Sequence, residues 1–145
     1  MNSETKKAIE KKYGQIKIYP DGFSVKEAIH NGRGRVAPIM QEKPWGAEIW
    51  IIYTDRYALK HLIVEEGKRF SLQRHEEKTE TWYFTAGEGL VTLGDKKIPV
   101  KTGDVIHAPA GTVHRAGATK GRLEFMEVSS PELWDVTRLE DDYGR

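Results

Sequence analysis

A chain of 145 residues is long enough to bury a core without cross-links, and the absence of cysteine excludes disulfides, thiol nucleophiles and Cys-based zinc sites. The formal net charge of +1 gives no overall attraction to nucleic acid or to a membrane surface. No apolar run approaches the ~18 residues of a membrane span, and the N-terminus lacks the apolar stretch of a signal peptide, so we expect a cytoplasmic protein.

Residues 1–43 are predicted to form an extension that packs on the following domain or on a partner chain. Residues 3–12 are rich in lysine and predict a short helix with little apolar face. Ser24 and Glu27 have the spacing of a capping box and predict a second helix that stops near residues 31–32. Residues 32–35 alternate Gly and Arg, which favours a solvated basic loop over a phosphate-binding loop.

Residues 44–145 are predicted to form a second unit, because from residue 43 the apolar pattern has a period of two. Short runs of this kind, separated by turn signals, are typical of an all-β jelly roll or small antiparallel barrel. Gly94 and Asp95 predict a tight hairpin, and Pro99 predicts an edge strand. Residues 131–145 are expected to lie back over the barrel. The predicted strands are 48–53, 57–64, 68–75, 80–85, 90–93, 96–100, 105–108, 113–118 and 122–129.

A constellation of potential metal ligands lies on these strands. Gln73 and His75 are two residues apart, so on a strand their side chains share a face. Glu80 begins the next alternating run, and His114 follows a Pro-Ala-Gly turn. Four nitrogen and oxygen donors without a thiolate suit a hard or borderline divalent metal ion. The remaining histidines, His30, His61 and His107, have no such framework and are expected to pack or to lie on the surface.

The spacing of these residues resembles the two cupin motifs. The first motif is matched by Gly67, Gln73, His75, Glu80 and Gly87, with Gln73 where many cupins have His. The second is matched by Gly103, Pro109, Gly111 and His114. The fifteen residues between Gly87 and Gly103 are typical of the short spacing in cupins. The resemblance implies a jelly-roll β-barrel with a short, partly helical N-terminal extension.

Within the cupins, the chain most resembles the C-terminal domain of type II mannose-6-phosphate isomerases. Lys78 stands where that family usually has Arg, and no nucleotidyltransferase domain is recognised, so sugar-nucleotide synthesis is not expected of this chain. The matching residues are Pro44, Trp45, Gly46, Lys60, Ser71, Leu72, Gln73, His75, Lys78, Glu80, His114, Arg115, Glu127, Val128, Arg138, Asp141, Tyr143, Gly144 and Arg145.

This resemblance implies one divalent metal ion held by Gln73, His75, Glu80 and His114. Zinc is the first candidate, with manganese, nickel, cobalt and iron open. The candidate catalytic residues are Lys78, Arg115 and Glu127, and the base is left open among them and a metal-bound hydroxide. The candidate substrate-binding residues are Lys60, Trp82, Arg115, Arg138, Tyr143 and Arg145.

The leading functional hypothesis is a metal-dependent isomerase that interconverts an aldose and a ketose phosphate, with mannose 6-phosphate and fructose 6-phosphate as the first pair. The alternatives are a sugar epimerase or dioxygenase on the same scaffold, and a non-catalytic sugar-binding cupin, because a fold does not determine function. A homodimer is expected because open strand edges need cover, with residues 13–40 over an edge or crossing to the partner.

Overall fold

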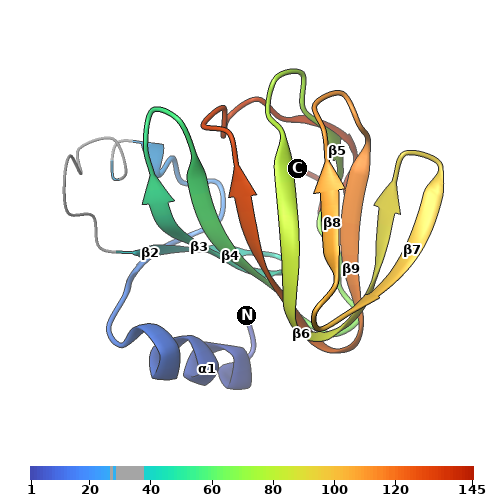
Figure 1. Ribbon diagram of the computed structural model, residues 1–145. Helices are drawn as coiled ribbons and strands as arrows, with labels where there is room; N and C mark the ends of the chain where they lie inside the picture. The colour runs from blue at the N-terminus through green and yellow to red at the C-terminus, as the bar shows by residue number, and fades with distance from the viewer. Residues whose placement is uncertain (27, 29–37) are drawn as a thin grey trace.

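The computed structural model describes residues 1–26, 28 and 38–145, so the predicted loop at 32–35, His30 and the end of the second predicted helix lie outside the described residues. One sheet of ten strands dominates the described part (Figure 1). No helix among the described residues is long and apolar enough to cross a membrane. The elements are α1 (Ser3–Tyr13), β1 (Lys17–Tyr19), β2 (Ile39–Lys43), β3 (Gly46–Tyr53), β4 (Ala58–Val64), β5 (Leu72–Arg74), β6 (Glu80–Leu93), β7 (Lys96–Lys101), β8 (Val105–Ala108), β9 (His114–Ser129) and β10 (Thr137–Glu140).

The two longest strands, β6 and β9, pair with each other along most of their length. The sequence predicted each of them as two strands, because glycines interrupt the apolar pattern. The interruption in β6 is an irregular stretch near Gly87 and not a turn. Gly87 has φ +75°, and a Cβ atom there would lie 2.2 Å from the carbonyl oxygen of Arg122. The glycine therefore permits a close approach of β6 and β9.

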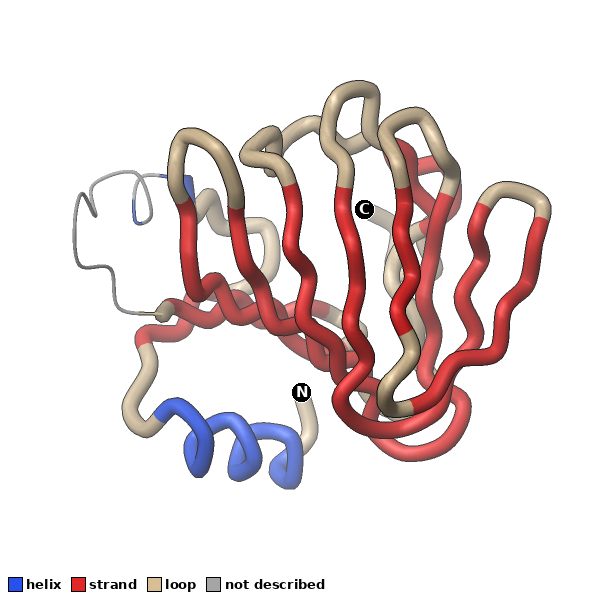
Figure 2. The backbone as a smooth tube through the Cα atoms, in the orientation of Figure 1, coloured by secondary structure: helices blue, strands red, loops and turns tan. Residues whose placement is uncertain are grey.

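The jelly-roll expectation is confirmed by the strand arrangement. β6 pairs with β8 near its start, with β7 near its end, and with β9 on its other side. The strands curl around a common interior, although hydrogen bonding does not close them into a ring in the described part of the chain (Figure 2). The predicted hairpin at Gly94 and Asp95 is present, since Leu93 pairs with Lys96. Pro99 lies on β7, whose only strand partner in the described sheet is β6.

The interior of the jelly roll is filled by aromatic and aliphatic side chains from facing strands. Trp82, Phe84 and Phe125 are fully buried, and their rings pack edge-on or tilted against one another. Such pairs contribute about 0.5–1.5 kcal/mol beyond burial alone. Trp82 of this cluster also packs against His114, with the ring centroids 5.4 Å apart, so the aromatic core adjoins buried polar side chains.

Helix α1 lies against the outer face of β2, β3 and β4, below the sheet in Figure 1. Its Ile9 is buried among Met40, Ile49 and Ile63, so the helix has a more effective apolar contact than its composition predicted. Asn2 caps the helix by accepting from the amide of Thr5. The helix is thus fixed to the sheet as well as capped.

The N-terminal segment contributes two strands that the sequence analysis missed. β1 pairs in parallel with β2, and β2 pairs with β3 from Ile39 to Lys43. Both strands are short, and a period of two cannot be recognised in so few residues. The sheet therefore includes residues on both sides of the boundary expected at 43/44. The expected homodimer stays a prediction.

Candidate metal centre and adjoining cavity

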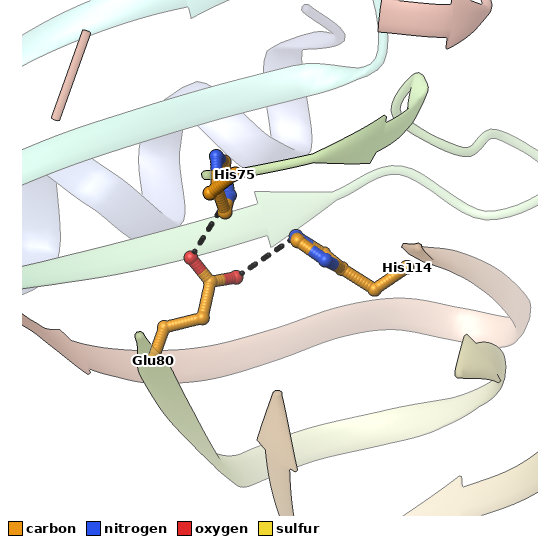
Figure 3. Close-up of side chains that lie close together, drawn as sticks. All are labelled: His75, Glu80 and His114. Atoms are coloured by element: carbon orange, nitrogen blue, oxygen red, sulfur yellow. Dashed lines mark ion pairs between the residues drawn. The ribbon is translucent and has the colours of Figure 1, made fainter. Parts of the chain in front are cut away.

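Three buried side chains, His75, Glu80 and His114, converge from different elements (Figure 3). The Oε2 atom of Glu80 lies 3.3 Å from Nε2 of His75, and Oε1 lies 3.2 Å from Nε2 of His114. Their potential ligand atoms all lie within 4.8 Å of one another. Two imidazoles and a carboxylate at this separation form a cluster that could hold a metal ion.

Main-chain carbonyls orient both imidazoles. Nδ1 of His75 is 2.6 Å from the carbonyl oxygen of Asp135, and Nδ1 of His114 is 2.9 Å from that of Thr112. Since a carbonyl only accepts, each Nδ1 donates, and in the neutral ring Nε2 keeps its lone pair. Nε2 of His75 is buried and has no aligned hydrogen-bond partner among the described residues. A lone pair of this kind fits a metal ion.

The strand register accounts for part of this convergence. Glu80 opens β6 and His114 opens β9. Gln73 on β5 pairs directly with His114, and directly opposed residues point to the same face of a sheet. The amide of Gln73 makes one long hydrogen bond, 3.5 Å from Nε2 to the carbonyl of Ser71. Gln73 therefore stays a predicted fourth ligand on the correct face.

Asp135 organises the loop between β5 and β6, and the sequence analysis did not identify it. Its carboxylate accepts hydrogen bonds from the amides of Glu76, Glu77 and Lys78, at 3.2, 2.6 and 3.1 Å. These main-chain bonds hold the pKa of the Asp135 carboxyl below its usual value. No local pattern links Asp135 to ligands more than fifty residues away, so only the folded C-terminal tail shows its role.

Lys78 is buried between two carboxylates. Its Nζ lies 2.7 Å from Oε2 of Glu80 and 3.1 Å from Oε2 of Glu127. Burial lowers the pKa of Lys78, but attraction to Glu127 and Glu80 outweighs burial and raises the pKa above its usual value. Burial likewise raises the pKa of Glu80, yet the positive charge of Lys78 outweighs burial and holds it well below its usual value. Glu80 is therefore a carboxylate and Lys78 an ammonium at neutral pH.

A cavity of about 510 Å³ adjoins this centre, within the size range of small-molecule sites. Five basic side chains and four acidic ones line it, and Arg138 is the basic one without an ion pair among the described residues. Burial raises the pKa of Glu48 in this wall, but Lys60, Lys43, Lys78 and Arg145 outweigh it and lower the pKa. The charged lining residues are Asp21, Lys43, Glu48, Lys60, Lys78, Glu80, Glu127, Arg138 and Arg145.

Several of the predicted catalytic and substrate-binding residues reach this cavity. Lys60 lies opposite Glu127 in the β4–β9 register, and its Nζ is 4.1 Å from the centre of the Trp50 ring. Arg138 and Arg145 come from the C-terminal tail, as expected from its return over the barrel. The predicted residues that line the cavity are Lys60, Gln73, Lys78, Glu80, Glu127, Arg138 and Arg145.

Three residues predicted to be catalytic or substrate-binding do not line this cavity. Arg115 follows His114 on a strand, so its side chain faces the other way. Its Nε donates to the carbonyl of Phe70 at 2.8 Å, and Nη1 is 3.4 Å from Oε2 of Glu140. These contacts link β9 to Phe70 and to β10. Trp82 is fully buried and donates from Nε1 to Glu80 at 2.8 Å, and Tyr143 donates to the carbonyl of Arg69. The expectation that Arg115 lies at the cavity mouth is corrected by this parity.

Comparison with known families identifies residues 37–141 as a match to the family described as mannose-6-phosphate isomerase C-terminal. The alginate biosynthesis protein AlgA of Pseudomonas aeruginosa is 36% identical over 107 residues, covering 71% of this chain and 22% of AlgA. Mannose-1-phosphate guanylyltransferase of Klebsiella pneumoniae is 32% identical over 108 residues, covering 71% of this chain and 23% of that protein. The chain thus spans about a quarter of the length of these relatives.

Solved structures share the fold. KdgF from Halomonas sp. has a TM-score of 0.62 at 23% identity, covering 66% of this chain and 90% of KdgF. A protein with a double-stranded β-helix domain from Klebsiella pneumoniae has a TM-score of 0.59 at 22% identity, covering 83% of this chain and 98% of that protein. Oxalate decarboxylase from Bacillus subtilis has a TM-score of 0.64 at 19% identity, covering 70% of this chain and 30% of that one.

Proposed function

The chain belongs to the mannose-6-phosphate isomerase C-terminal family, and we propose that it is a metal-dependent isomerase that interconverts an aldose phosphate and a ketose phosphate. Mannose 6-phosphate and fructose 6-phosphate are the first pair to test. The observation that carries the proposal is the buried His75, Glu80 and His114 cluster beside a cavity that also contains the Lys78–Glu127 ion pair.

The proposed metal ligands are His75, Glu80 and His114, with Gln73 as the fourth. The fit rests on the buried Nε2 of His75, which makes no aligned hydrogen bond among the described residues, and on the carboxylate state of Glu80. The donor set suits zinc first, with manganese, nickel, cobalt and iron as alternatives. When bound, such an ion supplies a Lewis acid that polarises the carbonyl and hydroxyl oxygens of the sugar.

The isomerisation moves one carbon-bound proton from C2 of the aldose to C1, while the hydroxyl proton of O2 passes to O1. Glu127 is assigned as the base that carries the proton between the carbons, because its carboxylate is buried and lines the cavity. Lys78 remains protonated, so it cannot accept that proton. It holds Glu127 through the 3.1 Å contact and offers a positive charge to the negative oxygen of the enediolate that forms when the C2 proton is removed.

The phosphate group of the substrate is assigned to the mouth of the cavity, meaning the part of its wall that is open to solvent and is lined by Asp21, Lys43, Arg138 and Arg145. Arg138 lines the cavity and has no ion pair among the described residues, so its guanidinium is available to a ligand. Arg145 lines the same mouth, although acidic side chains already contact it. Arginine suits this role because its planar fork can contact two phosphate oxygens at once.

The proposal is tested by following mannose 6-phosphate conversion with the metal-loaded chain and with Glu127→Gln. We expect turnover by the wild type and a loss of about 10²–10⁴-fold in kcat for the variant, the usual contribution of a general base. Glu88→Gln is the matched control, because Glu88 is exposed and does not line the cavity. Absence of turnover with a panel of aldose and ketose phosphates, on protein that retains metal, would contradict the proposal.

One observation favours a second candidate, a non-catalytic sugar-binding protein. Lys78 lies 2.7 Å from Oε2 of Glu80, so the chain itself supplies a positive charge beside the cluster. A cavity organised by this ion pair could bind a sugar phosphate and leave it unchanged. Saturable sugar-phosphate binding that persists after chelation, without turnover, would support this second candidate.

A further inference from the structure

The mouth of the cavity contains a carboxylate held between two cations. Oδ1 of Asp21 lies 3.7 Å from Nζ of Lys43 and 3.4 Å from Nη1 of Arg145. Lys43 ends β2, whereas Arg145 belongs to the C-terminal tail, and all three residues line the cavity. Two basic groups from distant parts of the chain therefore converge on a single oxygen atom.

These ion pairs are not needed to hold the segment that carries Asp21. Nε2 of Gln41 donates to the carbonyl oxygen of Phe23 at 2.6 Å and to that of Pro20 at 3.3 Å. Val25 is buried and packs in the apolar cluster that includes Leu133. The main chain on both sides of Asp21 is thus anchored independently, and its carboxylate can move away by side-chain rotation alone.

Arg145 is likewise positioned without Asp21. Its Nε and Nη2 contact the two carboxylate oxygens of Asp141 at 3.0 and 3.3 Å, and its amide donates to Asp141 at 2.9 Å. Only Nη1 is directed to Asp21. The side chains of Lys43 and Arg145 are 12% and 17% exposed, so their charges are less screened than those of a surface ion pair.

We propose that Lys43 and Arg145 form an anion subsite for the phosphate group of a phosphate monoester, and that the Asp21 carboxylate occupies this subsite when no ligand is bound. The inference rests on the proposed function, because it assigns a place to the substrate's phosphate. A phosphate group carries about two negative charges and three acceptor oxygens, so it can replace a carboxylate of single charge. Asp21 lies outside residues 37–141, which match the family.

The test is calorimetric titration of the full chain and of Asp21→Asn with inorganic phosphate and with mannose 6-phosphate. The asparagine keeps the size of the side chain and removes its charge. We expect both ligands to bind about 3- to 10-fold more tightly to the variant, since two partly buried ion pairs no longer compete. Asp95→Asn, in the exposed β6–β7 turn, is the control and should leave both affinities unchanged. Lys43→Met should weaken both.

The titrations are repeated after chelation, which separates phosphate bound at the mouth from phosphate bound to a metal ion. A gain in affinity before and after chelation supports the subsite. Unchanged or weaker binding by Asp21→Asn, or an equal gain for unphosphorylated mannose, would overturn it. Asp21→Ala is measured in parallel, so that one misfolded variant does not decide the result. If no sugar phosphate is converted but the gain remains, the isomerase proposal fails and the anion subsite stands.

Discussion

The imidazole of His75 donates from Nδ1 to the main-chain carbonyl of Asp135 over 2.6 Å, across a separation of sixty residues. The carboxylate of the same Asp135 accepts from the three amides of Glu76, Glu77 and Lys78. One residue of the C-terminal tail therefore fixes both the ring orientation of a proposed metal ligand and the loop that leads to Glu80. Residues that hydrogen-bond to the ligands of a metal ion usually affect the affinity for that ion.

Replacing Asp135 by Asn should lower the affinity for the metal ion about 10–100-fold, because the loop amides lose a charged acceptor while the His75 bond to the main chain remains possible. Competition with a chromophoric chelator measures the change. Asp95→Asn serves as the control. An unchanged affinity would show that the loop holds its conformation without the carboxylate.

Replacing Lys78 by Met should destabilise the fold by about 3–5 kcal/mol, because Glu80 and Glu127 would be left as buried carboxylates without their cation. Lys78→Arg, which keeps the charge, should lose much less. Urea unfolding in the presence of chelator measures both variants without a contribution from bound metal. Equal losses for Met and Arg would indicate that shape, and not charge, determines the stability of this site.

Helix α1 should be held to the sheet partly by the hydroxyl of Tyr13, which lies 2.7 Å from Nδ1 of His61. Tyr13→Phe removes this bond and should cost about 1 kcal/mol in the free energy of unfolding. Amide hydrogen exchange should show faster exchange in residues 3–13. Tyr57→Phe is a suitable control, because Tyr57 is exposed. Unchanged exchange in the helix would mean that the apolar contacts of Ile9 and the contacts of Met1 and Asn2 with Glu65 secure it without this hydrogen bond.

The contact between Glu124 and His61, 3.0 Å long, should make part of the protein's stability sensitive to acid. Burial raises its pKa, but the hydrogen bond and charge of His61, together with Arg122, outweigh burial and lower the pKa from the ordinary value of 4.5. A depressed folded-state pKa gives stability that is present above pH ~4.5 and is lost as the pH falls through the folded value. Glu124→Gln should therefore be less stable than wild type at pH 7, with the difference shrinking below pH 4.5. A difference independent of pH would contradict this linkage.

The sequence predicted the jelly roll and the grouping of His75, Glu80 and His114, because short apolar runs and fixed motif spacings are local signals. It missed β10, whose four residues are all exposed and so carry no apolar alternation. It misplaced Arg115 because adjacency to His114 was given more weight than strand parity, which directs neighbouring side chains to opposite faces. Asp21 and Asp135 could not be identified, since both act through contacts with residues distant in sequence.

We propose that His75, Glu80 and His114 hold a metal ion on which aldose–ketose phosphate isomerisation depends. The most direct measurement is mannose 6-phosphate conversion, followed by NMR, before chelation, after chelation and after stoichiometric re-addition of metal. We predict that chelation abolishes conversion, and that metal restores it in the wild type but not in a folded His75→Ala variant. Conversion that continues at full rate in metal-free protein, or that metal restores equally in His75→Ala, would contradict the claim.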